Sequence, residues 1–66
     1  MYDDIIAFMM SAEANIHPVT TREVAESLNI TVYQARYYLN DMYDRRVVER
    51  EEGNQRGRAL HWRLIA

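Results

Sequence analysis

The sequence predicts a mainly α, α+β domain in which three helices are followed by a β-hairpin. In the first two thirds of the chain, apolar residues recur at helical spacing, and two of the three helical segments follow a Thr-x-x-Glu or Thr-x-x-Gln motif. In the last third, apolar and polar residues alternate, which is the period of a strand. The 66 residues contain no cysteine, so we expect a single domain, residues 1–66, stabilised by packing alone.

The first helix is predicted from about Asp3 to Ala14. Its apolar residues are spaced by three and four positions: Tyr2, Ile5, Ile6, Met9 and Met10. Asp3 and Asp4 suit the positive end of the helix dipole. Pro18 lacks an amide donor, and the residue before a proline avoids the α region, so a connection is expected over residues 15–18.

The second helix is predicted to begin after Thr20, because Thr20 and Glu23 have the spacing of a capping box. Three residues supply its buried face: Val24, Ala25 and Leu28. Asn29 follows at the position where a left-handed residue closes a helix, a conformation that asparagine tolerates well. A tight turn is therefore expected over residues 28–31.

The third helix is predicted from Val32 to about Asp44, because Thr31 and Gln34 repeat the capping pattern. One face centres on Ala35 and is expected to be buried, with Tyr38 and Tyr43 flanking it. Its other members are Val32, Leu39 and Met42. The opposite face carries Tyr33, Tyr37, Asn40 and Asp44. Whether Tyr43 belongs to the core or to the surface stays open.

The last third predicts a β-hairpin with strands over residues 47–51 and 60–65 and a polar tip over residues 53–57. Leu60, Trp62 and Leu64 alternate with polar residues and are expected to close over the helices. Two capped helices are joined by a tight turn, and the small residue Ala25 lies where they would cross. Together with the hairpin that follows, this pattern predicts a winged helix-turn-helix.

The net charge of −2 is unfavourable for a nucleic-acid binder. Residues 1–28 hold one arginine against five acids, a balance of −4, whereas residues 29–66 hold seven arginines against five acids, a balance of +2. Four acids are expected near the side that would face DNA and would repel phosphate: Asp41, Asp44, Glu51 and Glu52. Weak intrinsic binding to DNA is therefore expected. The alternative for the arginines is that they are solvated surface residues without a binding role.

In a winged helix-turn-helix the third helix enters the major groove of double-stranded DNA. The residues expected to contact DNA are Thr31, Tyr33, Gln34, Arg36, Tyr37 and Asn40 on this helix, with Arg56 and Arg58 on the wing. Glutamine can pair with adenine, arginine with guanine, and tyrosine can meet a thymine methyl group or a phosphate. Glycines beside the wing arginines would let that loop follow a backbone or enter a minor groove.

No residue pattern predicts catalysis, a metal or a cofactor. His17 and His61 are far apart in the sequence and lack a partner at ligand spacing, and Ser11 and Ser27 lack a motif for activation. No apolar run is long enough to span a membrane, and the acidic N-terminus does not resemble a signal peptide, so a cytoplasmic protein is expected. Without a dimerisation helix, we expect a monomer.

The run from Thr31 to Leu39 resembles the recognition helix of the small fimbrial-operon regulators of enteric bacteria, the FaeA and PapI type. The resemblance extends to Ala25-Glu26, to the strand at residues 47–50, to Arg56-Gly57 and to Trp62. It implies a regulator of adhesin transcription that acts with the leucine-responsive regulatory protein at sites containing GATC and gives phase-variable expression. In such a regulator four residues of the third helix would face DNA, namely Tyr33, Gln34, Arg36 and Tyr37, and Arg56 would belong to the wing.

The alternative is a protein-interaction module that uses the same fold to hold another regulator without touching DNA. The negative total charge favours this alternative, whereas Arg56 and Arg58 on a glycine-bounded wing favour DNA. A structural or toxin-antitoxin component has no positive support in the sequence.

Overall fold

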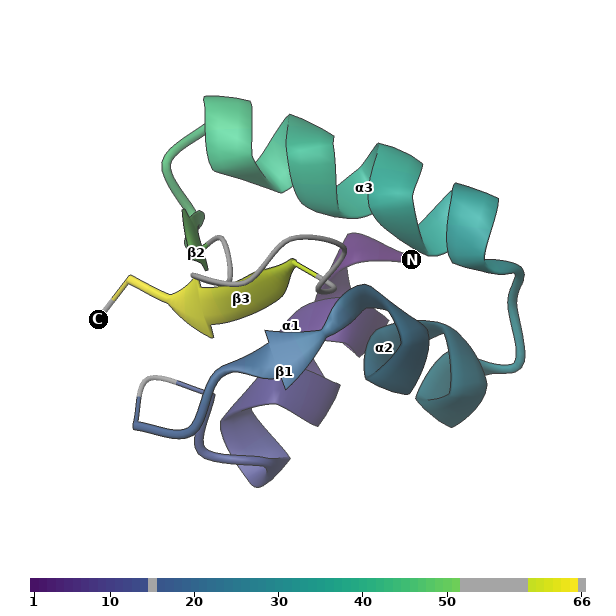
Figure 1. The fold of residues 1–66 in the computed structure, drawn as a ribbon, viewed down its shortest axis with the longest axis horizontal. Helices are drawn as coiled ribbons and strands as arrows, with labels where there is room; N and C mark the ends of the chain where they lie inside the picture. Colours follow the sequence, from purple (N-terminus) through teal and green to yellow (C-terminus); the bar gives the residue numbers. More distant parts are fainter. Residues whose placement is uncertain (15, 52–59, 66) are drawn as a thin grey trace.

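The computed structural model describes residues 1–14, 16–51 and 60–65. The elements, in chain order, are α1 (Tyr2–Ser11), β1 (Val19–Thr20), α2 (Thr21–Leu28), α3 (Val32–Asp44), β2 (Val48–Glu51) and β3 (His61–Leu64). The strands form one antiparallel sheet in the order β1-β3-β2. In Figure 1, α3 runs along one side of the molecule, whereas α1, α2 and β1 lie on the other side.

Both predicted capping boxes are present, and they define where α2 and α3 begin. The Thr20 hydroxyl accepts from the Glu23 amide over 3.0 Å, and the Glu23 carboxylate accepts from the Thr20 amide over 2.8 Å. Asn29 ends α2 in the left-handed conformation, with φ 56°. The helix-turn-helix predicted from the sequence is therefore confirmed, with α3 bounded as expected.

The predicted first helix is too long, since α1 ends at Ser11 rather than at Ala14. Glu13 adopts φ 55°, which turns the chain out of the helix. The Ala14 amide then donates to the Met9 carbonyl over 2.8 Å, so the last turn is closed by its own backbone. Ala14 itself is fully buried and belongs to the core.

The hairpin is confirmed in its two strands, which pair Val48 with Leu64 and Glu51 with His61. The predicted tip, residues 53–57, lies outside the described residues. A third strand, β1, was not predicted; it pairs Val19 with Trp62. This strand is only two residues long and immediately precedes α2, so it leaves little local pattern in the sequence.

The core lies between the three helices and β3, and Trp62 is its largest fully buried side chain. The other large side chains that are fully buried are Ile5, Met9, Leu39, Met42, Val24 and Val48. Leu60 and Leu64 are partly buried against this core, as predicted. Val32 was expected in the buried face but is 36% exposed, because it is the first residue of α3.

No helix in the described part of the chain has the length and apolar character that crossing a membrane requires.

Candidate nucleic-acid interface

The outward face of α3 carries large side chains that do not pack on the core. Tyr33 is 79% exposed and Tyr37 is 70% exposed, one helical turn apart, and Arg36 beside them is also exposed. We call these three residues the α3 crest. Ala35 and Leu39 on the opposite side of the helix are fully buried, so the orientation of α3 is fixed by the core. The crest thus presents two aromatic rings and a guanidinium on a rigid helix.

Thr31 and Gln34, both predicted to contact DNA, are exposed and bonded to each other. The Gln34 carbonyl oxygen Oε1 accepts from the Thr31 amide over 3.0 Å, and the Thr31 hydroxyl accepts from the Gln34 amide over 3.0 Å. The capping box therefore uses Oε1, which a bidentate contact to adenine would also need. The side-chain amide Nε2 of Gln34 is left to donate to a base or phosphate while the cap stays closed.

The flank of α3 that faces α1 holds an acid in a network of donors. Asp41 Oδ2 accepts from the Tyr2 hydroxyl over 2.5 Å and from Arg45 Nε over 3.0 Å. The Tyr2 ring meets Tyr38 edge-to-face at 5.5 Å, and Tyr38 meets Tyr37 of the crest in the same way at 5.5 Å. Asp41 is one of the acids expected to repel phosphate, and its charge is partly compensated by Arg45.

The hydrogen bond from Tyr2 to Asp41 raises the pKa of the Tyr2 phenol above its ordinary value of 10.0, with smaller contributions from burial and from the negative charge of Asp41. A tyrosine phenol is already protonated at neutral pH, so the raised pKa extends the range in which Tyr2 donates to Asp41 further into alkaline solution.

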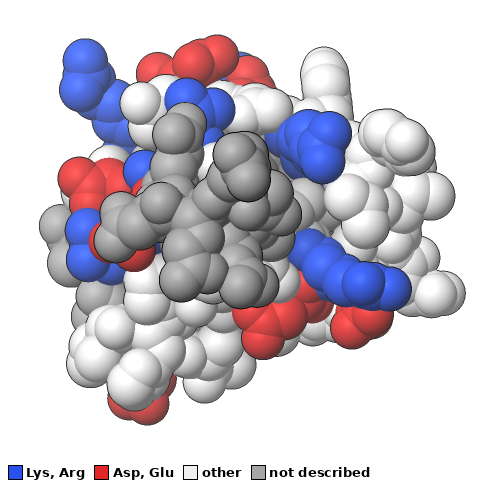
Figure 2. Space-filling view, viewed as in Figure 1, with Lys and Arg blue, Asp and Glu red and all other residues white. Residues whose placement is uncertain are grey.

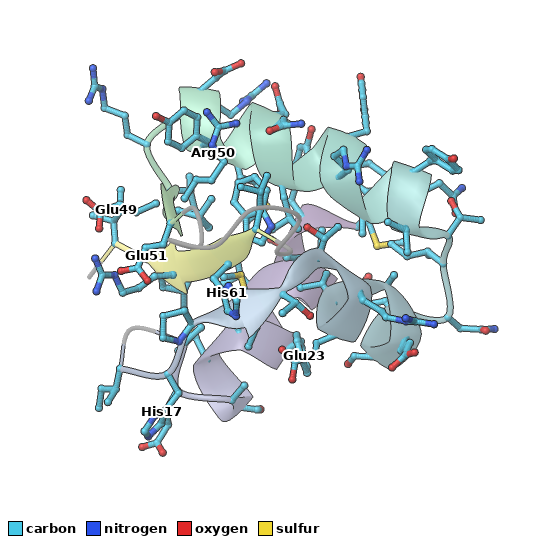
Figure 3. All side chains as sticks on the ribbon, viewed as in Figure 1. His17, Glu23, Glu49, Arg50, Glu51 and His61 are labelled. Carbon is cyan, nitrogen blue, oxygen red and sulfur yellow. The ribbon has the colours of Figure 1, made fainter. Side chains whose placement is uncertain are left out.

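The flank of α3 that faces the sheet holds Arg50, which was not among the residues predicted to contact DNA. Arg50 Nη1 donates to Asn40 Oδ1 over 3.3 Å, and its guanidinium lies 4.6 Å from the centre of the Tyr43 ring. Figure 3 shows Arg50 directed toward the C-terminal half of α3. Tyr43 is 40% exposed, which places it on the surface. The sequence did contain a signal for this position of Arg50. Arg50 follows the buried Val48 by two residues, and residues two apart in a strand share a face, so both lie on the side of β2 that faces the helices.

The sheet separates its charges by face. Arg50 is paired with the buried Trp62 and shares its face, whereas Glu49 and Glu51 lie on the other face, opposite Arg63 and His61. Arg63 forms ion pairs of 3.1 Å with both Glu49 and Glu51. Glu51 is one of the acids expected near the side that would face DNA, and strand alternation turns it away from α3; Figure 3 shows both glutamates apart from that helix.

The remaining predicted contacts, Arg56 and Arg58, and the acid Glu52 lie outside the described residues. Across the visible face in Figure 2, basic and acidic groups are interspersed, and the described residues form no continuous basic patch there. Asp44 is exposed at the end of α3.

Within residues 1–14, 16–51 and 60–65, no group of three or more histidines and acids is placed to hold a metal ion.

A surface cleft of about 310 Å³ lies at the C-terminal end of α3, away from Tyr33 at its N-terminal end. Its lining is mixed in charge and polarity: Tyr43, Asp44, Arg46, Val48, Glu49 and Ile65. The cleft contains no arrangement of groups typical of a catalytic centre, so the crest and its two flanks are the surface of α3 best suited to recognition.

A family model described as FaeA-like protein matches residues 1–66. Among solved structures, a point mutant of ZitR from Lactococcus lactis is similar, with a TM-score of 0.71 and 16% sequence identity. The match covers 94% of this chain and 41% of the ZitR chain, so this chain spans about two fifths of the length of ZitR. At that identity the likeness shows the fold, a winged helix-turn-helix. A comparison with curated proteins gives no match.

Proposed function

The chain belongs to the FaeA-like protein family over residues 1–66, and from that premise we propose that it is a transcriptional regulator that binds double-stranded DNA through α3. The observation that carries the proposal is the α3 crest, which exposes Tyr33, Arg36 and Tyr37 on a helix whose other side is locked into the core. Most of the surface of both tyrosines is left unpacked, and both rings can meet thymine methyl groups or phosphates in a major groove.

Within this function, α3 lies in the major groove and the wing contacts the backbone or the minor groove through Arg56 and Arg58. Arg36 is suited to guanine because its guanidinium offers paired donors. Gln34 and Thr31 contact DNA beside the N-terminus of α3, where the Gln34 Nε2 group is not used by the cap. The tyrosines supply contact area rather than charge.

The finer function that we propose follows the FaeA and PapI resemblance: control of a fimbrial operon together with the leucine-responsive regulatory protein at sites containing GATC. The electrostatics support a need for a partner. The net charge is −2, so counterion release alone gives little affinity. A DNA-bound partner raises the effective concentration of the regulator at its site.

The second candidate is a module that binds another regulator without contacting DNA. The crest favours it to the extent that tyrosine and arginine are also enriched in protein interfaces. Salt dependence separates the two candidates, because contacts with phosphates release counterions and contacts with an uncharged protein surface do not.

The experiment titrates a labelled fimbrial operator duplex containing GATC with the protein at several salt concentrations, with and without the leucine-responsive regulatory protein. We expect binding that is weak alone, stronger with the partner, and weaker as salt rises. A duplex in which GATC is replaced, with the flanking sequence unchanged, is the matched control. The DNA proposal is contradicted if, both with and without the partner, no binding is detected or the affinity does not fall as salt rises. Either result favours the second candidate.

A further inference from the structure

We propose that Arg50, at the base of the wing rather than at its tip, contacts a DNA phosphate, and that Asn40 acts in DNA binding by positioning Arg50 rather than by reading a base. This inference rests on the proposed function, because it assumes that the surface of α3 meets DNA. It adds a contact on β2 and changes the role expected for Asn40.

Two groups on α3 hold Arg50 in place. Its Nη1 donates to Asn40 Oδ1 over 3.3 Å, and its guanidinium lies over the Tyr43 ring at 4.6 Å from the ring centre. Arginine carries five N–H donors, so one bond to Asn40 leaves others available for a phosphate. An arginine that is already held by an amide and an aromatic face loses less side-chain entropy on binding than a mobile one.

The two acids that flank Arg50 in the sequence are separated from it by the sheet. The acids on either side of it in the sequence, Glu49 and Glu51, lie on the other face and pair with Arg63. Among the described residues, the ion pairs involve Arg22, Arg45 and Arg63, and none involves Arg50. The positive charge of Arg50 is therefore directed to the α3 side, where a phosphate backbone would pass beside the helix in the groove.

The side chain of Asn40 already makes a hydrogen bond within the protein. Its Oδ1 accepts from Arg50, and reading adenine in the major groove requires that oxygen as an acceptor together with the amide as a donor. Asn40 is also only partly exposed, unlike Tyr33 and Tyr37 of the crest. Its side chain is thus better suited to holding Arg50 than to reaching a base edge.

The experiment is a double-mutant cycle with Arg50→Ala, Asn40→Ala and the combined variant, titrated against the operator duplex and against mixed-sequence duplexes of equal length at several NaCl concentrations. Arg63→Ala is the matched control, because it removes one arginine from the adjacent strand but on the opposite face of the sheet. Circular dichroism and thermal unfolding establish that each variant is folded.

We expect Arg50→Ala to lower the slope of log affinity against log salt by about 1 and the affinity by roughly 5- to 10-fold near 0.1 M salt. Asn40→Ala should weaken binding to all duplexes alike, and should have little further effect in the Arg50→Ala background. Arg63→Ala should leave the slope nearly unchanged.

Three results overturn different parts of this assignment. If the wild-type protein binds DNA and Arg50→Ala keeps its affinity and salt slope, the Arg50 contact is wrong while the proposed function stands. If Asn40→Ala alters sequence preference and keeps that effect without Arg50, Asn40 reads a base directly. If the wild-type protein shows no salt-dependent binding to any duplex, with or without its partner, the proposed function fails and this inference fails with it.

Discussion

The Tyr2 hydroxyl donates a hydrogen bond to Asp41 Oδ2 over 2.5 Å and so joins the first residue of α1 to the surface of α3. Arg45 donates to the same oxygen over 3.0 Å. An acid on the helix that we propose to contact DNA therefore has two hydrogen-bond donors, one of them from α1. The contact also fixes Tyr2 against Tyr38, whose ring supports Tyr37 of the crest.

This hydrogen bond predicts a pH-dependent stability. Because the folded-state pKa of Tyr2 is raised above 10.0, its contribution is fully present below pH 10.0 and is lost as pH rises through the raised pKa. We expect Tyr2→Phe to unfold at a lower temperature than the wild type at pH 7, and the difference to shrink in alkaline solution. Thermal unfolding from pH 7 to pH 11 measures it.

The control for Tyr2 is the same substitution in an Asp41→Ala background, where it should change the unfolding temperature little. A difference between Tyr2→Phe and the wild type that stays constant up to the most alkaline pH would contradict the role assigned to the hydroxyl.

A second prediction concerns the hydrogen bond that the Trp62 indole makes inside the core. Its Nε1 donates to the Thr21 hydroxyl over 2.8 Å, and both residues are buried. Thr21→Val leaves the indole N–H without a partner and should lower the free energy of unfolding by about 1–3 kcal/mol. Urea unfolding followed by tryptophan fluorescence measures it. Thr21→Ser keeps the hydroxyl and should cost less; an equal or greater loss would show that shape, not the hydrogen bond, matters.

The sequence predicts the helix-turn-helix well because its signals are local. Capping boxes act within four residues, so Thr20 and Thr31 locate the starts of α2 and α3 without knowledge of the rest of the fold. Asn29 is likewise recognisable because few residue types tolerate φ 56°.

The features that were not predicted depend on contacts between distant residues or on an uncommon backbone conformation. β1 exists because Val19 pairs with Trp62, and the end of α1 depends on a positive φ at Glu13, a residue type that does not favour it. Arg50 becomes a candidate only when β2 packs beside α3. The sequence shows that Arg50 shares a strand face with Val48, but it does not show that Asn40 on α3 is the partner of Arg50.

A third prediction separates base contacts from backbone contacts. Arg36→Ala removes a crest guanidinium and should cost about 1–3 kcal/mol on the preferred operator while relaxing sequence preference. Arg56→Ala should weaken binding to all sequences alike and lower the salt slope by about 1. Fluorescence anisotropy on the operator and on a scrambled duplex measures both effects, with Arg63→Ala as the charge-matched control. Negligible and identical effects of the two substitutions would refute the assigned roles.

The central claim is that the exposed side of α3 is the DNA-binding surface, and NMR mapping of the labelled protein with an operator duplex tests it most directly. We predict that the largest changes in amide and side-chain signals occur at Tyr33, Arg36, Tyr37 and the Arg50 guanidinium, while Glu49 and Arg63 on the outer face of the sheet change little. Changes concentrated on that outer face, with the α3 signals unmoved, would contradict the claim.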